Sequence, residues 1–179
     1  FSKDFPGGIM VLTGANSAVG LRSMPCRYIF MDEIDSFPTD IDNEGDAVSL
    51  AEKRTMTFSR RKILMTSTPT IRDMSRIEQE YLESDMRRFY IPCPLCGEYQ
   101  YLQWSQVKWE DNDPKTAKYE CEHCRGKFEE RHKPEFLAKG EWRATAPFDG
   151  ITAGFHLNGL YSPLGWKSWE EIVSDFIKA

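Results

Sequence analysis

The sequence predicts an α/β fold, a parallel sheet covered by helices, with a small β-rich module appended to it. In the first half of the chain, short apolar runs typical of buried strands alternate with a stretch of helical composition. Near residue 89 the composition changes to cysteine pairs, aromatic residues and short alternating runs. The cysteine spacing favours a zinc-ribbon module. We therefore expect three parts, at residues 1–88, 89–143 and 144–179.

Length and composition suit a soluble globular protein. The 179 residues, 40% of them hydrophobic, suffice for one medium domain or for part of one with a small module. Apolar runs are far shorter than the roughly 20 residues that cross a bilayer, so we expect a cytoplasmic protein with no membrane partner. The net charge of −5 argues against a surface that coats DNA uniformly but leaves local basic patches open. The chain starts at Phe1 and ends within a helical pattern, which suggests a segment of a longer protein.

Three apolar runs are expected to form buried strands. They span residues 9–13, 27–31 and 62–70, and the turn sequence Gly14-Ala15-Asn16-Ser17 follows the first run. Residues 46–57, between the second and third runs, have helical composition. A strand, helix, strand order with uninterrupted apolar strands indicates parallel pairing.

Two further helices are predicted. Residues 75–88 form a charged pattern with a narrow apolar face. In the tail, Ser168 and Glu171 have the spacing of a capping box at the start of a helix with an apolar stripe, which needs a surface to pack against. We expect the aromatic stretch before it, residues 154–163, to fold back against the core of the first part.

Two C-x-x-C pairs, separated by 24 residues, predict a structural Zn²⁺ site; they are Cys93 and Cys96, and Cys121 and Cys124. Four thiolates complete a tetrahedral shell and leave no position for a reactive water. A glycine follows each pair closely, at Gly97 and Gly126, where a tight turn lets backbone amides approach the sulfurs.

Other residues of the module leave alternatives open. His123 and His132 can replace a thiolate ligand, although a solvated turn histidine is the simpler interpretation, and Cys26 is interpreted as an inert buried thiol. The ribbon can be a scaffold only. It can also present a basic or an aromatic set to DNA or to another subunit, namely Lys127, Arg131 and Lys133, or Tyr99, Tyr101 and Trp104.

The second apolar run leads directly into two carboxylates, Asp32 and Glu33. In ATP-hydrolysing α/β proteins a strand end delivers one carboxylate to Mg²⁺, and a second acid beside it polarises the attacking water. Hydroxyl residues end the next strand at Thr66, Ser67 and Thr68, and parallel pairing would place them at the same edge. An exposed acidic turn is the competing interpretation.

Two features qualify an ATPase hypothesis. The later acids from Asp35 to Asp46 are interpreted as solvated loop charges, because they do not directly follow the strand. The phosphate-binding pattern G-x-x-x-x-G-K-[ST] does not occur, so either the protein is not a nucleotide enzyme or that loop lies before Phe1.

The order of the motifs resembles the large terminase subunit of lambda-like tailed phages, the GpA family of DNA-packaging motors. The resemblance runs through essentially the whole chain and rests on "GANSAVGLRSMPCRYIFMDEIDSFP", "EGDAVSLAEKRTMTF", "KILMTSTPT", "YIPCPLCGEYQYLQW", "CEHC" and "GFHLNGLYSPLGWKSWEEIV". Members couple an N-terminal P-loop ATPase to a C-terminal metal-dependent endonuclease, and move DNA into an empty capsid.

The resemblance implies part of a P-loop NTPase (ASCE/RecA-like) sheet that works with Mg²⁺-ATP. Asp32 would be the Walker B magnesium ligand, Glu33 the catalytic carboxylate, and Ser67 and Thr68 the coupling motif. Arg22 would approach phosphate or a neighbouring subunit, and Arg54 and Arg72 are further candidates for a trans-acting arginine. The implied partners are double-stranded viral DNA, the small terminase subunit, the portal or procapsid, and further copies of the chain.

The departures from the family pattern limit the expectation. Without a Walker A motif the isolated segment should be inactive, and no nuclease-type acidic constellation follows residue 140. Two alternatives stay open: a DEAD-like helicase or translocase with an inserted zinc ribbon, and a zinc-ribbon adaptor that binds DNA or protein and hydrolyses nothing. The adaptor leaves the acidic strand end unexplained.

Overall fold

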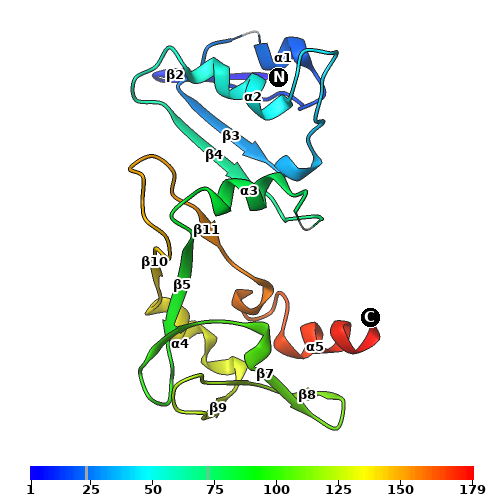
Figure 1. Cartoon of the computed structure of the whole chain (residues 1–179), viewed down its shortest axis with the longest axis vertical. Coiled ribbons are helices and arrows are strands. Elements are labelled where there is room, and N and C mark those ends of the chain that lie inside the picture. The colour runs from blue at the N-terminus through cyan, green and yellow to red at the C-terminus, as the bar shows by residue number, and fades with distance from the viewer. Residues whose placement is uncertain (23, 72) are drawn as a thin grey trace. The chain divides into compact units, whose positions relative to one another are not determined.

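The computed structural model describes residues 1–22, 24–71 and 73–179, and it contains two compact units, Phe1–Glu80 and Tyr81–Ala179 (Figure 1). Several small sheets combine with short helices, which confirms the mixed α/β class. The three-part domain division stays a prediction. Within the described residues, no helix has the length and apolar character needed to span a membrane.

The first unit is built on a parallel pair of strands, β3 (Tyr28–Asp32) and β4 (Lys62–Thr66). Their register pairs Tyr28 with Lys62 at one end and Asp32 with Thr66 at the other. The chain between them forms the 3₁₀ turn Ile34–Ser36, helix α2 (Ala47–Glu52) and the 3₁₀ turn Lys53–Thr55. Helix α1 (Ala18–Arg22) precedes β3, and α3 (Arg76–Leu82) follows β4.

The core of the first unit covers one face of this strand pair. Met31 and Ile34 are buried with Ala47 and Val48 of α2. On the strands, Tyr28, Phe30 and Leu64 are 50%, 77% and 50% exposed. The prediction that these strands are buried is therefore wrong for six of their ten residues, which are exposed, because the described helices cover only one side.

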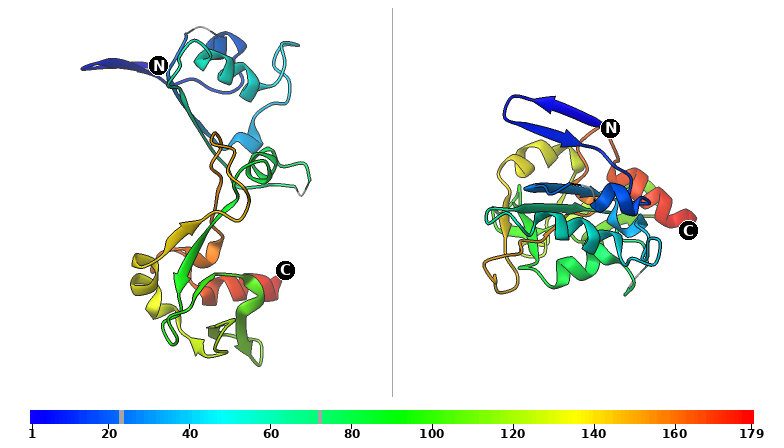
Figure 2. Two further views of the ribbon diagram at one scale, coloured as in Figure 1. Left: turned by 60° about the vertical axis from the view of Figure 1, so that its left-hand side comes forward. Right: turned by 90° about the horizontal axis from the view of Figure 1, so that it is seen from above.

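The first predicted strand belongs to an exposed hairpin. Strand β2 (Gly8–Val11) pairs antiparallel with β1 (Ser2–Phe5), and Gly7 takes a φ of 93° in the turn. Every residue of both strands is exposed, and the hairpin extends away from α1 and α2 (Figure 2). The predicted burial of residues 9–13 is wrong, because no described element packs over them.

The helix predicted over residues 75–88 ends at Leu82. Ser84 Oγ donates to the Tyr81 carbonyl at 2.6 Å and accepts from the Met86 amide at 3.1 Å, and Met86 takes a φ of 48°. These bonds turn the chain, so the residues from Arg87 onward join strand β5 instead of the helix.

The second unit contains two sheets. Strand β5 (Arg87–Pro92) pairs antiparallel with β10 (Glu141–Arg143) and β6 (Tyr99–Tyr101), and parallel with β11 (Phe155–His156). The other sheet contains β7 (Val107–Glu110), β8 (Asp113–Glu120) and β9 (Lys127–Phe128). Helices α4 (Lys133–Ala138) and α5 (Trp169–Lys178), with 3₁₀ turns at Trp104–Gln106, Glu130–His132 and Gly159–Tyr161, complete the unit.

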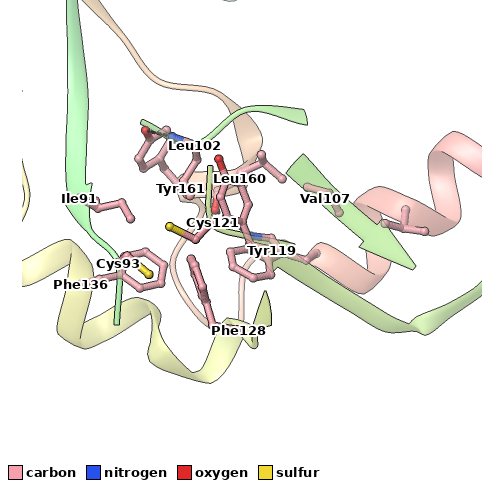
Figure 3. Packing of buried hydrophobic residues seen from close by; sticks show 12 residues of the cluster. Ile91, Cys93, Leu102, Val107, Tyr119, Cys121, Phe128, Phe136, Leu160 and Tyr161 are labelled. Atoms are coloured by element: carbon pink, nitrogen blue, oxygen red, sulfur yellow. Dashed lines mark hydrogen bonds between the residues drawn. The ribbon is translucent and has the colours of Figure 1, made fainter. Parts of the chain in front are cut away.

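An aromatic core holds the second unit together (Figure 3). Tyr119 and Phe128 pack with Trp169 at ring-centroid distances of 5.9 and 6.1 Å. Leu160 and Val173, from the tail, belong to the same core. The tail therefore packs within the second unit, and the expectation that residues 154–163 join the core of the first part is wrong. The predicted capping box at Ser168 and Glu171 is confirmed.

Candidate functional sites

The acidic end of β3 lies beside the hydroxyl end of β4. Asp32 and Thr66 are register partners, and Thr66 Oγ1 donates to Asp32 Oδ1 at 2.5 Å. Ser67 Oγ accepts from the Asp35 amide at 3.2 Å and donates to the Thr68 carbonyl at 3.4 Å. Parallel pairing thus brings the carboxylates and the hydroxyls together at one edge, as their order in the sequence indicated.

Glu33 occupies an uncommon backbone conformation. Its φ of 56° and ψ of 47° lie in the left-handed region, which few residues other than glycine adopt. The residue is exposed and begins the 3₁₀ turn Ile34–Ser36. Seven other non-glycine residues among those described also have a positive φ, so the conformation shapes the turn and does not by itself mark a catalytic residue.

Asp35 anchors the loop that follows, a role that the sequence did not reveal. Its Oδ1 accepts from the Ile77 amide at 2.8 Å, and its Oδ2 accepts from the Thr70 amide and hydroxyl at 3.0 and 3.2 Å. Burial opposes ionisation of this carboxyl, but the hydrogen bonds outweigh it and lower its pKa. Asp35 therefore connects the end of β3 to the segment that follows β4 and to the start of α3.

The interpretation of the later acids as solvated loop charges is incomplete, because three of them also accept hydrogen bonds from backbone amides, although Asp40 is exposed. Besides Asp35, Asp40 accepts from the Asn43 and Gly45 amides at 3.2 and 3.0 Å. Asp46 caps α2 through the Ser49 amide at 2.9 Å and forms an ion pair with Arg76 at 3.2 Å. These carboxylates lie opposite backbone amides, so they shape the loop.

The candidate arginines have local partners or lie outside the described residues. Arg22 forms an ion pair with Glu44 at 2.5 Å, and the guanidinium of Arg54 donates to the Arg22 carbonyl. Arg72 is not among the described residues. Partial burial raises the pKa of Cys26, which suits its interpretation as an inert thiol.

The two cysteine pairs meet in the second unit. The sulfurs of Cys93, Cys96, Cys121 and Cys124 all lie within 4.8 Å of one another, and Cys96 Sγ is 3.8 Å from Cys121 Sγ. Tetrahedral zinc, with bonds of about 2.3 Å, sets its sulfurs about 3.8 Å apart, so the arrangement fits that ion. Among the described residues no other group of three or more such ligands comes together.

Each cysteine pair lies in a tight turn, which we call a knuckle, and the two knuckles need their glycines for different reasons. Gly97 takes a φ of 81°, but the equivalent left-handed residue in the second knuckle is Arg125, with a φ of 60°. Gly126 is needed for space, because a Cβ there would lie 2.5 Å from Leu95 Cδ1 and 3.3 Å from Cys124 Sγ. One glycine supplies a backbone conformation and the other a close approach.

Burial and backbone amides act on the pKa values of the thiols in opposite directions. Burial raises the pKa of Cys93 to about 12, whereas at Cys121 the amides of Cys124 and His123 outweigh burial and lower the pKa to about 7. His123 contacts the Tyr99 carbonyl at 3.3 Å. Neither His123 nor His132 belongs to the thiol cluster, so the alternative of a histidine ligand receives no support.

Fold and sites together define a mixed α/β protein with an acidic end on a parallel strand pair and a separate four-thiol cluster. Comparison with known proteins gives its family. Residues 1–142 match the family model described as "Phage terminase large subunit gpA, ATPase domain", and the chain belongs to that family.

Two curated relatives agree with this assignment. The chain is 32% identical over 205 residues to "Terminase, large subunit" of Enterobacteria phage P21, a match that covers 99% of this chain and 31% of the relative. It is 31% identical over 192 residues to "Terminase, large subunit" of Escherichia phage lambda, covering 92% of this chain and 29% of the relative. The chain thus spans about a third of the length of these relatives. No solved structure matches the chain.

Proposed function

We propose that this chain is the part of a phage DNA-packaging motor that supplies the carboxylate edge of its ATP-hydrolysing site and a structural zinc site. The observation that carries the proposal is the β3–β4 register, which sets Asp32 opposite Thr66 in a chain of the terminase ATPase family. The acids and hydroxyls then occupy the carboxyl edge of parallel strands, where α/β proteins bind their ligands.

Each residue at this edge has a distinct proposed role. Asp32 holds the Mg²⁺ of Mg²⁺-ATP, and the ion neutralises charge on the phosphates. Glu33 accepts a proton from the attacking water. Ser67 and Thr68 transmit the state of the site, because the Ser67 hydroxyl contacts the Asp35 amide two residues beyond Glu33. Arg22, released from Glu44, is the proposed phosphate contact.

The four thiols have a structural role in this proposal. Cys93, Cys96, Cys121 and Cys124 bind one Zn²⁺, whose closed shell holds the knuckles against the aromatic core. Cys93 and Cys121 are themselves 2% and 0% exposed within that core. The bound ion would thus add to the stability that the aromatic core gives the second unit.

The partners follow from the family. In the full-length protein the motor acts on double-stranded viral DNA in the host cytoplasm, with the small terminase subunit, the portal or procapsid, and further copies of the large subunit. The endonuclease that accompanies the motor is assigned to the full-length protein, and none of its residues is proposed here.

The test is Glu33→Gln in the full-length protein. The amide cannot take a proton from water, so we expect ATP to bind normally while its turnover falls by at least about a hundredfold. Nucleotide binding by calorimetry and phosphate release in a single turnover measure the two steps separately.

A matched control removes a charge from the same loop. Asp42 is exposed, with a φ of 53° that asparagine tolerates, so Asp42→Asn should hydrolyse ATP normally. Normal turnover by the Glu33→Gln protein would remove Glu33 from the mechanism. Absence of ATP turnover in the unmodified full-length protein would instead favour the non-enzymatic adaptor.

A further inference from the structure

One face of the four-stranded sheet in the second unit combines arginines with tyrosines. Residues paired across neighbouring strands point to the same side, and so do alternate residues along one strand. The register therefore places eight residues on one side, among them Pro92 of β5 and Glu141 of β10. The other six form what we call the arginine–tyrosine face: Arg88 and Tyr90 of β5, Tyr99 and Tyr101 of β6, Arg143 of β10 and His156 of β11.

Flat cations and aromatic rings alternate across this face. The guanidinium of Arg88 lies 4.4 Å from the centre of the Tyr101 ring, and that of Arg143 lies 4.5 Å from the Tyr99 ring and 5.0 Å from the Tyr90 ring. All six side chains are exposed or partly exposed. Guanidinium groups held over tyrosines present both charge and a planar stacking surface to solvent.

A cavity of about 220 Å³ opens beside Arg88. Tyr101 and His156 of the face line it together with Trp104, Gln103 and Asn158, and its remaining walls are Leu102 and Tyr161. It is smaller than the roughly 300–1,000 Å³ of typical small-molecule sites, which suits one planar group of a polymer. Aromatic and amide side chains match such a group, because rings stack on it and amides bond its edge.

The charges around the cavity favour an anionic ligand. No carboxylate lines the cavity, and among the described residues Arg88 forms no ion pair. Burial and then the Arg88 charge lower the pKa of His156, which leaves Arg88 as the cation of the cavity near neutral pH. Two acids contact residues of the face or of the cavity: Glu141 pairs with Arg143 at 2.6 Å, and Glu122 accepts from Gln103 at 3.4 Å.

The basic set that the sequence offered as an alternative is largely neutralised. Lys133 is 1% exposed and bonds Glu130 at 2.5 Å. Arg131 pairs with Glu129 at 3.2 Å. Within the described part of the chain, these contacts leave Lys127 as the unpaired cation of that set, just as the Glu141 pair leaves Arg88 on the arginine–tyrosine face. The arginine–tyrosine face differs because its unpaired cation lines a cavity and lies over an aromatic ring.

We propose that the arginine–tyrosine face binds single-stranded nucleic acid, with one unpaired base in the cavity and neighbouring phosphates on Arg88 and Arg143. A base can project from its strand into the cavity only when it is not paired, and stacking on tyrosine and tryptophan tolerates any base. Binding does not require ATP hydrolysis, so the inference stands apart from the proposed catalytic edge.

The test measures binding of a fluorescent oligothymidine of about 12 nucleotides to the zinc-loaded chain, by anisotropy at several salt concentrations. Arg88→Gln and Tyr101→Leu should each raise the Kd about tenfold, because the first removes the cation of the cavity and the second removes a stacking surface from a base. Arg143→Gln should reduce the slope of log K against log salt by about 0.7, the value for one lost phosphate contact on a single strand. Zinc content and melting temperature identify any variant that fails to fold.

Controls separate this site from general electrostatics. Arg131→Gln removes the same charge from the alternative basic set and should leave the Kd unchanged, as should Glu33→Gln in the proposed catalytic edge. A duplex of the same length should bind more weakly than the strand. The proposal is overturned if the duplex binds as tightly, if Arg131→Gln weakens binding as much as Arg88→Gln, or if folded Arg88→Gln and Tyr101→Leu both bind normally.

Discussion

At the scale of single residues, Asp35 is the most informative side chain of the first unit. Its carboxylate joins three parts of the chain, namely the end of β3, Thr70 after β4, and the first turn of α3 at Ile77. Each bond is charge-assisted, and such bonds to a carboxylate are stronger than neutral ones. Asp35, two positions after Glu33, therefore connects the backbone at Glu33 directly to α3.

Asp35→Asn tests this anchor. The asparagine side chain has one acceptor oxygen, and its NH₂ group would face backbone N–H groups that need an acceptor. We therefore expect the free energy of unfolding of the first unit to fall by about 1–3 kcal/mol. Amide hydrogen exchange at Thr70 and Ile77 should speed up, whereas Asp42→Asn should leave it unchanged. Unaltered exchange in the Asp35→Asn protein would show that the anchor carries no stability.

The same anchor predicts a pH dependence with a definite sign. The folded state lowers the pKa of Asp35, so its stabilisation is complete well above the unfolded value of about 3.9 and is lost as pH falls through the folded value. In the unmodified protein, the protection of the Thr70 and Ile77 amides against hydrogen exchange should therefore weaken below about pH 4. The Asp35→Asn protein should lack this step.

Sequence reasoning succeeds or fails at single residues according to how local the contacts are. The cap at Asp46 lies three residues from Ser49, a spacing that is visible in the sequence. The partners of Asp35 are 32, 35 and 42 residues away, so no local pattern marks that carboxylate. The position of Asp32 at the strand edge was predictable, because Asp32 ends an apolar run.

At the scale of elements, the strongest local signals were confirmed. The capping box that begins α5 is present, and α2 begins after its aspartate cap. Errors arose where tertiary contacts decide, as at the end of α3, where Ser84 bonds redirect the chain. The apolar runs predicted strands correctly but overstated their burial, because composition does not tell how many faces of a sheet are covered.

The zinc knuckles give a prediction at this scale. Cys93→Ser removes a ligand from the buried side of the cluster, so we expect release of about one equivalent of zinc and a lower melting temperature. Tryptophan fluorescence follows the second unit, because all five tryptophans lie there. A fluorimetric zinc chelator measures the metal.

The fifth cysteine is the matched control. Cys26 lies in the first unit, outside the thiol cluster, so Cys26→Ser should retain the zinc. Gly126→Ala should weaken zinc binding with all four sulfurs intact, because its Cβ would press on Leu95 and Cys124. Metal analysis that finds no zinc in the unmodified protein would contradict the structural zinc site.

At the scale of the whole molecule, the resemblance of the motifs predicted the family, but the packing of the tail was not predictable. Tyr161 donates to the Phe89 carbonyl and accepts from the Leu102 amide, both at 2.6 Å, across 72 and 59 residues of sequence. These bonds bring the tail into the core of the second unit. The many aromatic residues of the tail indicated that it is buried. They did not indicate which part of the chain it packs against.

The whole-molecule claim is that this chain contributes the magnesium-binding edge of a motor ATPase, and Mn²⁺ binding tests it most directly. In the full-length protein with a non-hydrolysable ATP analogue, electron paramagnetic resonance reports bound Mn²⁺ in place of Mg²⁺. Asp32→Asn should bind Mn²⁺ at least about tenfold more weakly, while Glu33→Gln binds it normally. Equal Mn²⁺ binding by the Asp32→Asn and unmodified proteins would contradict the account.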